Sequence, residues 1–130
     1  MDVQNFAAWL TAFGDAWEQH NPDATAALLA PGATLQPSPF GDLVRGRRRL
    51  AAHWAEVMAE QQAIRFQAEI LGVGATYGLA HWRVVFGGEN RTVRVVDGIL
   101  PAAFDRRERA TSARGWSHEE TRPLDFEADR

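Results

Sequence analysis

The sequence predicts an α+β domain in which three N-terminal helices lie against a curved, mostly antiparallel sheet. Two observations predict it. In the first half of the chain, apolar side chains recur every three or four positions, which is the period of one helix face. From Ala63 onward they recur at every second position, which is the period of a half-buried strand. Because helices laid across a curved sheet leave a concave space, this order favours a pocket for a small molecule.

Three helices are expected in the first half. The first covers residues 3–20. The second is short, because Asn21 and Pro22 start it and a Pro-Gly pair ends it near residue 30. The third begins at about Arg47. The inner faces of the first and third helices carry Phe6, Leu10, Phe13, Trp17, Leu50, His53, Trp54, Val57 and Met58.

The strands are expected mainly in the second half, where four of them form a meander. One short strand stands earlier, and a Pro-rich loop at residues 37–46 follows it. A Gly-Gly-Glu-Asn turn at residues 87–90 predicts a hairpin. The expected strands are residues 33–37, 64–70, 78–87, 91–104 and 110–119.

Length and composition exclude several classes of protein. The 130 residues fit one domain, expected over residues 1–120, with an acidic tail at 121–130. The absence of cysteine excludes disulfide scaffolds, Cys-ligated metal sites and thiol catalysis. A net charge of −3 argues against a nucleic-acid partner. No apolar run approaches the ~20 residues of a membrane span, and the first residues lack signal-peptide features, so a cytoplasmic protein without a membrane partner is expected.

Several local phrases resemble the nuclear transport factor 2-like superfamily, in particular its SnoaL-like bacterial branch. They extend to about Glu120 and keep the family's order and spacing. The phrases are Asn21-Pro22-Asp23-Ala24, Pro39-Phe40, Arg45-Gly46-Arg47, His53-Trp54, Ala80-His81-Trp82, Val96-Asp97-Gly98-Ile99 and Ala113-Arg114-Gly115-Trp116-Ser117-His118. The resemblance implies a cone-shaped α+β fold, a deep pocket between the sheet and the helices, and a homodimer formed through the sheet. It implies no single activity, since the superfamily contains ketosteroid isomerases, polyketide cyclases, epoxide hydrolases, dehydratases and noncatalytic proteins.

The catalytic residues of ketosteroid isomerases are missing at the positions that the resemblance assigns to them. Ser38 stands in place of the Asp base, Phe13 in place of the Tyr donor, and Leu100 in place of a protonated Asp. An apolar side chain can neither accept nor donate the proton. The chain is therefore not expected to be a ketosteroid isomerase.

The other chemistries of the superfamily point to two candidate residues. Limonene-type epoxide hydrolases keep an Arg and an Asp two residues apart on one strand. Arg94 and Asp97 are three apart and are expected to face opposite sides, so this match is poor. SnoaL-type cyclases rely on an Asp or a His in the pocket, a role that suits Asp97 and His118.

Asp97 is the main candidate for acid–base catalysis. Alternation places its carboxylate on an apolar side of the long strand, with Val93, Val95 and Ile99. Burial there would raise its pKa unless an Arg or a His offsets the cost, and this suits a general acid or base at the pocket wall. The alternative is a structural Asp that is satisfied by backbone amides or an Arg, or that is turned outward by a bulge at Gly98.

The histidines also have two interpretations each. His118 suits a proton shuttle, or is a surface residue that the neighbouring glutamates keep protonated. His53 is on the inner face of the third helix. A core residue satisfied by hydrogen bonds is expected there in preference to a catalytic residue. His81 is expected on the side of the sheet opposite to Trp82, at a dimer interface or on the surface. No metal site is expected, because no two histidines have the spacing of a ligand pair.

The aromatic side chains favour a flat hydrophobic ligand, with no cofactor. Gln36, Ser38 and Arg83 are possible polar contacts for it, and the arginines of residues 45–49 either bind an anion or form a solvated surface. Two functions stay open: a lyase, isomerase or hydrolase that uses Asp97 and His118, or a noncatalytic ligand-binding or dimerisation module. The residues expected to line the pocket are Phe13, Trp17, Gln36, Ser38, Phe40, His53, Trp54, Met58, Phe66, Trp82, Phe86 and Trp116.

Overall fold

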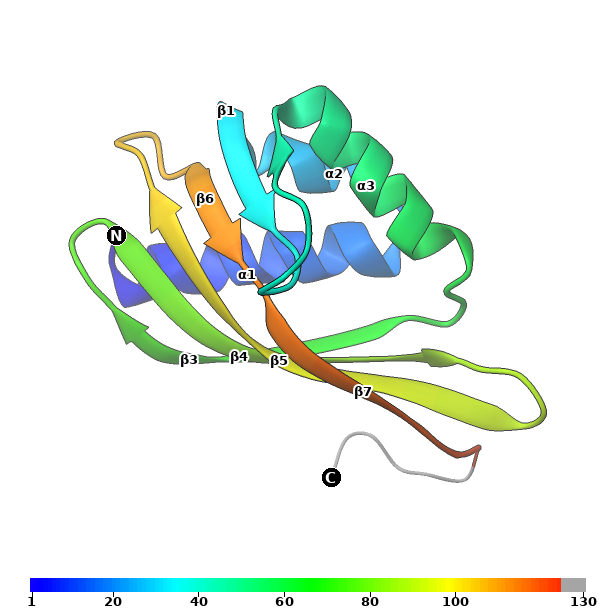
Figure 1. Cartoon of the computed structure of the whole chain (residues 1–130). Helices are drawn as coiled ribbons and strands as arrows, with labels where there is room; N and C mark the ends of the chain where they lie inside the picture. Colours follow the sequence, from blue (N-terminus) through cyan, green and yellow to red (C-terminus); the bar gives the residue numbers. More distant parts are fainter. Residues whose placement is uncertain (125–130) are drawn as a thin grey trace.

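All three helices lie on the concave side of one curved sheet (Figure 1). The computed structural model describes residues 1–124. The fold is α+β, as the sequence predicts. The helices and strands are α1 (Val3–Glu18), α2 (Pro22–Ala27), β1 (Leu29–Gln36), β2 (Val44–Arg45), α3 (Arg47–Ala59), β3 (Arg65–Val73), β4 (Tyr77–Gly87), β5 (Thr92–Phe104), β6 (Ala110–Arg114) and β7 (Trp116–Pro123).

The sheet is built around β5, its longest strand. The strand order is β2-β1-β6-β5-β4-β3, and β7 also pairs with β5. The first part of β5 pairs with β7, and its last residues pair with β6. The single strand β5 therefore connects these two parts of the curved sheet. Every pairing is antiparallel except that of β1 with β6. The sheet is thus mostly antiparallel, in agreement with the prediction.

The caps expected at the starts of the first two helices are present. The Asp2 carboxylate accepts a hydrogen bond from the Asn5 amide at 2.7 Å, and the Asn21 side chain accepts one from the Ala24 amide at 3.1 Å. α1 ends at Glu18, two residues earlier than expected, because His20 has a left-handed backbone with φ of 54°.

Three local expectations need correction. The Pro-rich loop contains the short strand β2, in which Arg45 pairs with Thr34 of β1. The segment expected as one closing strand is divided into β6 and β7 at Gly115, whose amide donates to the Gln36 carbonyl at 2.7 Å. β7 continues to Pro123, so the sheet extends into the expected tail; residues 125–130 lie outside the described residues.

The main core lies between the helices and the inner face of the sheet. Phe6, Leu50 and Val84 are completely buried there. At the edge strand β3, the Glu18 carboxylate accepts a hydrogen bond from the Phe66 amide at 2.8 Å, so α1 is also tied to the sheet by a polar contact. No helix within residues 1–124 is long and apolar enough to cross a membrane.

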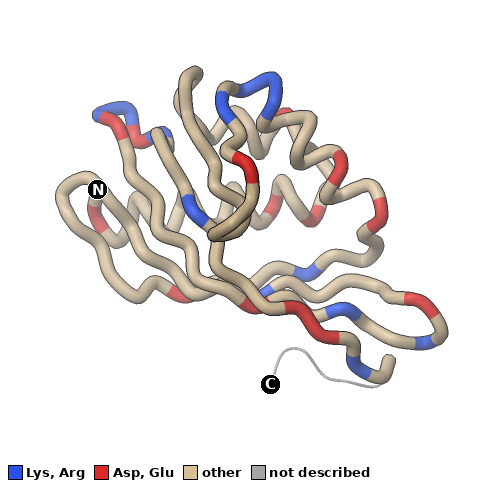
Figure 2. Tube along the Cα trace, in the orientation of Figure 1, with Lys and Arg blue, Asp and Glu red and all other residues tan. Residues whose placement is uncertain are grey.

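Arginines gather at two places in the fold, around the first turn of α3 and in the turn between β5 and β6 (Figure 2). One arginine of the first turn has a structural role, because the Arg47 guanidinium donates two hydrogen bonds, at 3.0 and 3.1 Å, to the Leu29 carbonyl. This contact joins the start of α3 to the start of β1.

Candidate functional site

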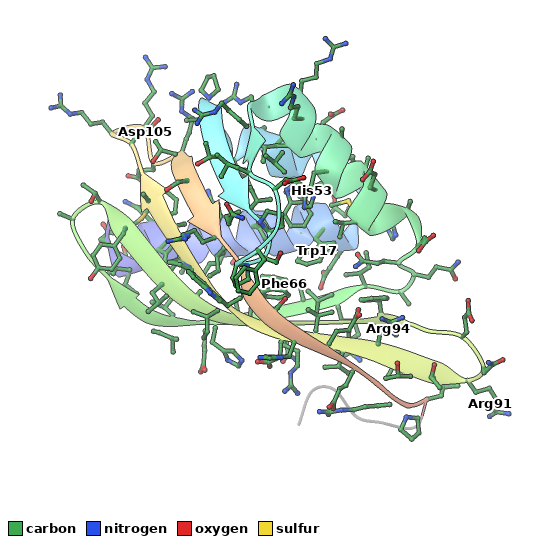
Figure 3. The ribbon with its side chains drawn as sticks, in the orientation of Figure 1. Trp17, His53, Phe66, Arg91, Arg94 and Asp105 are labelled. Carbon is green, nitrogen blue, oxygen red and sulfur yellow. The ribbon has the colours of Figure 1, made fainter. Side chains whose placement is uncertain are left out.

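A cavity of about 250 Å³ lies between α1, α3 and the inner face of the sheet. Trp17, His53 and Phe66 lie in this space (Figure 3). The lining contains no Asp, Glu, Arg or Lys from residues 1–124. The residues that line it are Trp9, Phe13, Trp17, Leu29, Leu35, Pro37, His53, Trp54, Val57, Gln61, Phe66, Trp82, Val96, Leu100, Ala113, Gly115 and Ser117.

Trp17 is the centre of the aromatic wall. Its ring centroid lies 5.1 Å from that of Trp54 on α3, 5.8 Å from that of Trp82 on β4 and 5.9 Å from that of Phe66 on β3. Tilted and edge-to-face rings at these distances attract one another. Because these rings come from four different elements, the wall forms only when the helices are seated on the sheet.

The Trp17 indole also determines the orientation of a polar side chain. Its Nε1 donates to the Gln61 Oε1 at 2.7 Å. An indole N–H can only donate, so the carboxamide oxygen must face Trp17. The Gln61 nitrogen then lies on the side of the carboxamide that does not contact Trp17. Gln61 therefore offers two N–H donors where it borders the cavity.

His53 is the second polar side chain of interest. It is half-buried on α3, and its ring lies edge-on to Trp54 at 5.5 Å. Burial lowers the pKa of His53, against the smaller opposing effect of the Glu56 charge. The imidazole is thus neutral near pH 7. Within the described part of the chain it is the only Asp, Glu, His, Lys or Arg side chain that lines the cavity.

The structure brings together six of the twelve residues expected to line the pocket. These are Phe13, Trp17, His53, Trp54, Phe66 and Trp82. Two of the positions compared with ketosteroid isomerases, Phe13 and Leu100, also face the cavity, whereas Ser38 does not.

The other six expected lining residues lie elsewhere. The Gln36 side chain turns back to donate to the Ser38 carbonyl at 2.9 Å, and Phe40 is fully exposed on its loop. Met58 and Phe86 are buried in the core without lining the cavity. Trp116 lies on the outer face of the sheet, where the Arg114 guanidinium is 5.1 Å from its ring centroid.

Asp97 does not lie at the pocket wall, which corrects the main catalytic expectation. Trp82 pairs with Gly98 across the β4–β5 ladder and Arg83 pairs with Asp97, so the carboxylate faces away from Trp82 and the cavity. It shares its side with Val93 and Val95, as alternation predicts. That side is the outer face, where these valines form a small apolar cluster separate from the core.

The Asp97 carboxylate belongs to a row of charged groups across the outer face. It accepts from Arg83 Nε at 2.9 Å and contacts His81 Nε2 at 2.9 and 3.0 Å. His81 Nδ1 lies 3.0 Å from Glu69. Since carboxylates only accept, these contacts favour the protonated form of His81, in which both ring nitrogens donate. We call Glu69, His81, Asp97 and Arg83 the outer-face row.

The contacts of the outer-face row shift two pKa values. The hydrogen bond to Asp97, opposed by partial burial and assisted by Glu69, raises the pKa of His81. Burial opposes ionisation of Asp97, but the hydrogen bonds and charges of His81 and Arg83 hold its pKa below the ordinary value. His118 lies exposed opposite Asp97 on β7, so it too is outside the cavity.

The structure gives no pattern of side chains that could hold a metal. Within residues 1–124, no group of three or more His, Cys, Asp or Glu side chains could bind an ion. The cavity itself, with one neutral His, one Gln and one Ser among apolar groups, is suited to an uncharged organic molecule.

Comparisons with known proteins bear on the fold and the family. The model of the SnoaL-like domain matches residues 10–100. No protein of curated function matches the sequence. Among solved structures, SalBIII, an epoxide hydrolase/cyclase-like enzyme of pyran ring formation in the polyether salinomycin, is similar with a TM-score of 0.76. Its identity is 11%, over 90% of this chain and 93% of that chain.

Two further structures share the fold. The Delta 5-3-ketosteroid isomerase of a Mycobacterium species has a TM-score of 0.70 and 18% identity, over 89% of this chain and 98% of its own. A hypothetical protein of Catenulispora acidiphila with a ketosteroid isomerase-like fold, in complex with trimethylamine, has a TM-score of 0.71. It is 19% identical, over 83% of each chain. The three helices on a curved sheet and the match over most of the chain place this protein in the SnoaL-like domain family of the nuclear transport factor 2-like superfamily.

Proposed function

We propose that this protein binds a small, flat, uncharged hydrophobic molecule in the cavity between the helices and the sheet. The observation that carries the proposal is the lining, in which six Trp and Phe rings lie among aliphatic side chains and no carboxylate, guanidinium or ammonium group of residues 1–124 takes part. Removing apolar surface from water drives such binding, and an ionic ligand would meet no opposite charge there. The volume is at the small end of ligand pockets, which suits a molecule of one or two rings.

Binding without catalysis agrees better with this cavity than an acid–base mechanism does. Acid–base enzymes commonly place two titratable groups in one site, with pKa values that their surroundings push apart. Among the described residues, His53 is the only titratable side chain that lines the cavity, while Asp97 and His118 lie on the outer face. The relatives in structure include an epoxide hydrolase/cyclase-like enzyme and a ketosteroid isomerase, whose names refer to small organic substrates. They support a small-molecule ligand without specifying a reaction.

Two substitutions on the same strand test the proposal. Ser117 lines the cavity and His118 faces the opposite side, so Ser117→Phe fills the cavity and His118→Phe leaves it open. Naphthalene serves as the probe, and calorimetry measures its Kd. Wild type and His118→Phe should bind it with similar Kd values, and Ser117→Phe should bind it at least about tenfold more weakly, the equivalent of about 1.4 kcal/mol. Failure of the wild type to bind, or equal binding by both variants, would refute the proposal.

We further propose that a second copy of the chain covers the outer face of the sheet. Trp116 is partly exposed there, opposite Ile99 in the ladder. The outer-face row places two acidic and two basic side chains side by side, which suits a surface that meets its own copy across a two-fold axis. The superfamily resemblance implies the same homodimer.

A further inference from the structure

Gln61 stands where the aromatic cavity meets a wider, polar groove. It borders the cavity, and it also borders the groove between the end of α3 and the β4–β5 hairpin. The charged side chains on the groove side include Glu56, Glu60 and Glu89, together with Arg94, which forms an ion pair with Glu119. A bound molecule that keeps its rings in the apolar interior would therefore present its polar end near Gln61.

The carboxamide of Gln61 offers its nitrogen as a donor toward such a molecule. Its oxygen already accepts the Trp17 indole N–H at 2.7 Å, and rotation of the amide by 180° would set two donors against each other. The Gln61 main chain is also held, because its carbonyl accepts from His20 Nε2 and its amide donates to the Met58 carbonyl at 3.1 Å. A donor that is fixed in this way loses little entropy when it binds an acceptor.

Resting on the proposed binding function, we infer that the ligand is an uncharged carbonyl compound whose oxygen accepts a hydrogen bond from Gln61 Nε2. Trp17 acts as the positioning residue that aims the donor. A carbonyl oxygen fits because it accepts without carrying charge, and the cavity lining that residues 1–124 form holds no cation that would compensate a carboxylate or a phosphate.

A pair of probes with the same shape isolates this hydrogen bond. 2-Acetylnaphthalene and 2-isopropenylnaphthalene differ only by C=O against C=CH2. Calorimetry on the wild-type protein should give a Kd about five- to tenfold lower for the ketone, which is the effect of one buried hydrogen bond of about 1 kcal/mol. Equal Kd values would overturn the inference while leaving the proposed function intact; no binding of either probe would overturn both.

Two variants assign the effect to one side chain. Gln61→Glu keeps an oxygen for the Trp17 N–H and removes the donors, so the preference for the ketone should vanish while the hydrocarbon still binds. Gln62→Glu adds the same charge at the next, exposed residue outside the cavity and should keep the preference. If Gln61→Glu does not fold, Gln61→Met serves instead with the same expected result. Retention of the preference in a folded Gln61 variant would overturn the assignment.

Discussion

Gly98 lets three parts of the protein approach closely, because it has no side chain. A Cβ atom at this position would lie 2.5 Å from the Trp116 carbonyl oxygen, 2.9 Å from Ser117 Cβ and 3.0 Å from an atom of the Trp82 ring. Main-chain atoms of a paired strand have little room to move. Gly98 therefore determines both the pairing of β5 with β7 and the position of one wall of the cavity.

The substitution Gly98→Ala should destabilise the protein by about 1–3 kcal/mol, because the added methyl group overpacks the site. Gly32→Ala is the matched control, since a Cβ there would have no neighbour within 4 Å. It should change the free energy of unfolding by less than about 0.5 kcal/mol. Urea unfolding monitored by circular dichroism measures both values. Similar stability of the two variants would show that β7 adjusts without cost.

At the level of strands, the outer-face row gives the sheet a pH-dependent contact. His81 has a raised pKa, so its stabilisation is fully present below about pH 6.5 and is lost as the pH rises through the folded-state pKa. Asp97 has a lowered pKa, so its stabilisation is present above about pH 3.9 and is lost as the pH falls through the folded-state pKa. The row is therefore most stabilising between these limits.

The variant His81→Gln should be less stable than wild type at pH 5.5 and should approach it at pH 8.5. Partly exposed ion pairs of this kind contribute about 0.2–1 kcal/mol to the free energy of unfolding. His53, with its lowered pKa, has the opposite dependence, losing stabilisation as the pH falls, but it is present in both proteins and cancels in the difference. Urea unfolding at the two pH values tests the prediction. A constant difference between the proteins would contradict it.

The same strands show what the sequence can and cannot specify. Alternation correctly placed His81 opposite to Trp82 and grouped Asp97 with Val93 and Val95. It fixes which side chains share a face, but not which face is inside. The valine-rich side of β5 is expected to be the pocket wall, whereas in the structure it is the outer face. The pairing of Gly98 with Trp82 shows which side of β5 faces the cavity.

Element type was more predictable than the composition of the cavity. The helix caps at Asp2 and Asn21 follow from local hydrogen bonds, so sequence alone identified them. Gln61 was missed because its role depends on Trp17, 44 residues away. The available signal was a spacing of four residues: Val57 follows His53 by four, and Gln61 follows Val57 by four. Phe40 was misplaced because a family phrase does not determine how a surface loop turns.

For the whole molecule, the proposed homodimer predicts a mass in solution of twice 14.4 kDa. Ile99→Arg places a charge beside Trp116 in the middle of the outer face and should convert the dimer to monomer, since an unpaired charge in an interface is costly. Val3→Arg, at an exposed position at the start of α1, is the control and should remain dimeric. Sedimentation velocity at micromolar concentration gives the masses. A wild-type protein of 14.4 kDa would contradict the proposal.

The hydrogen bond between Glu18 and Phe66 has a further consequence, for aggregation. A sheet grows into fibrils when an edge strand offers free N–H and C=O groups to another chain. Of the two end strands in the order β2-β1-β6-β5-β4-β3, β2 is only two residues long, and β3 has the Phe66 N–H occupied by a carboxylate from α1. A strand added to β3 would have to displace that carboxylate and leave it uncompensated. Strand addition is thus disfavoured at these two end strands, and at β3 the Glu18 carboxylate is the group that opposes it.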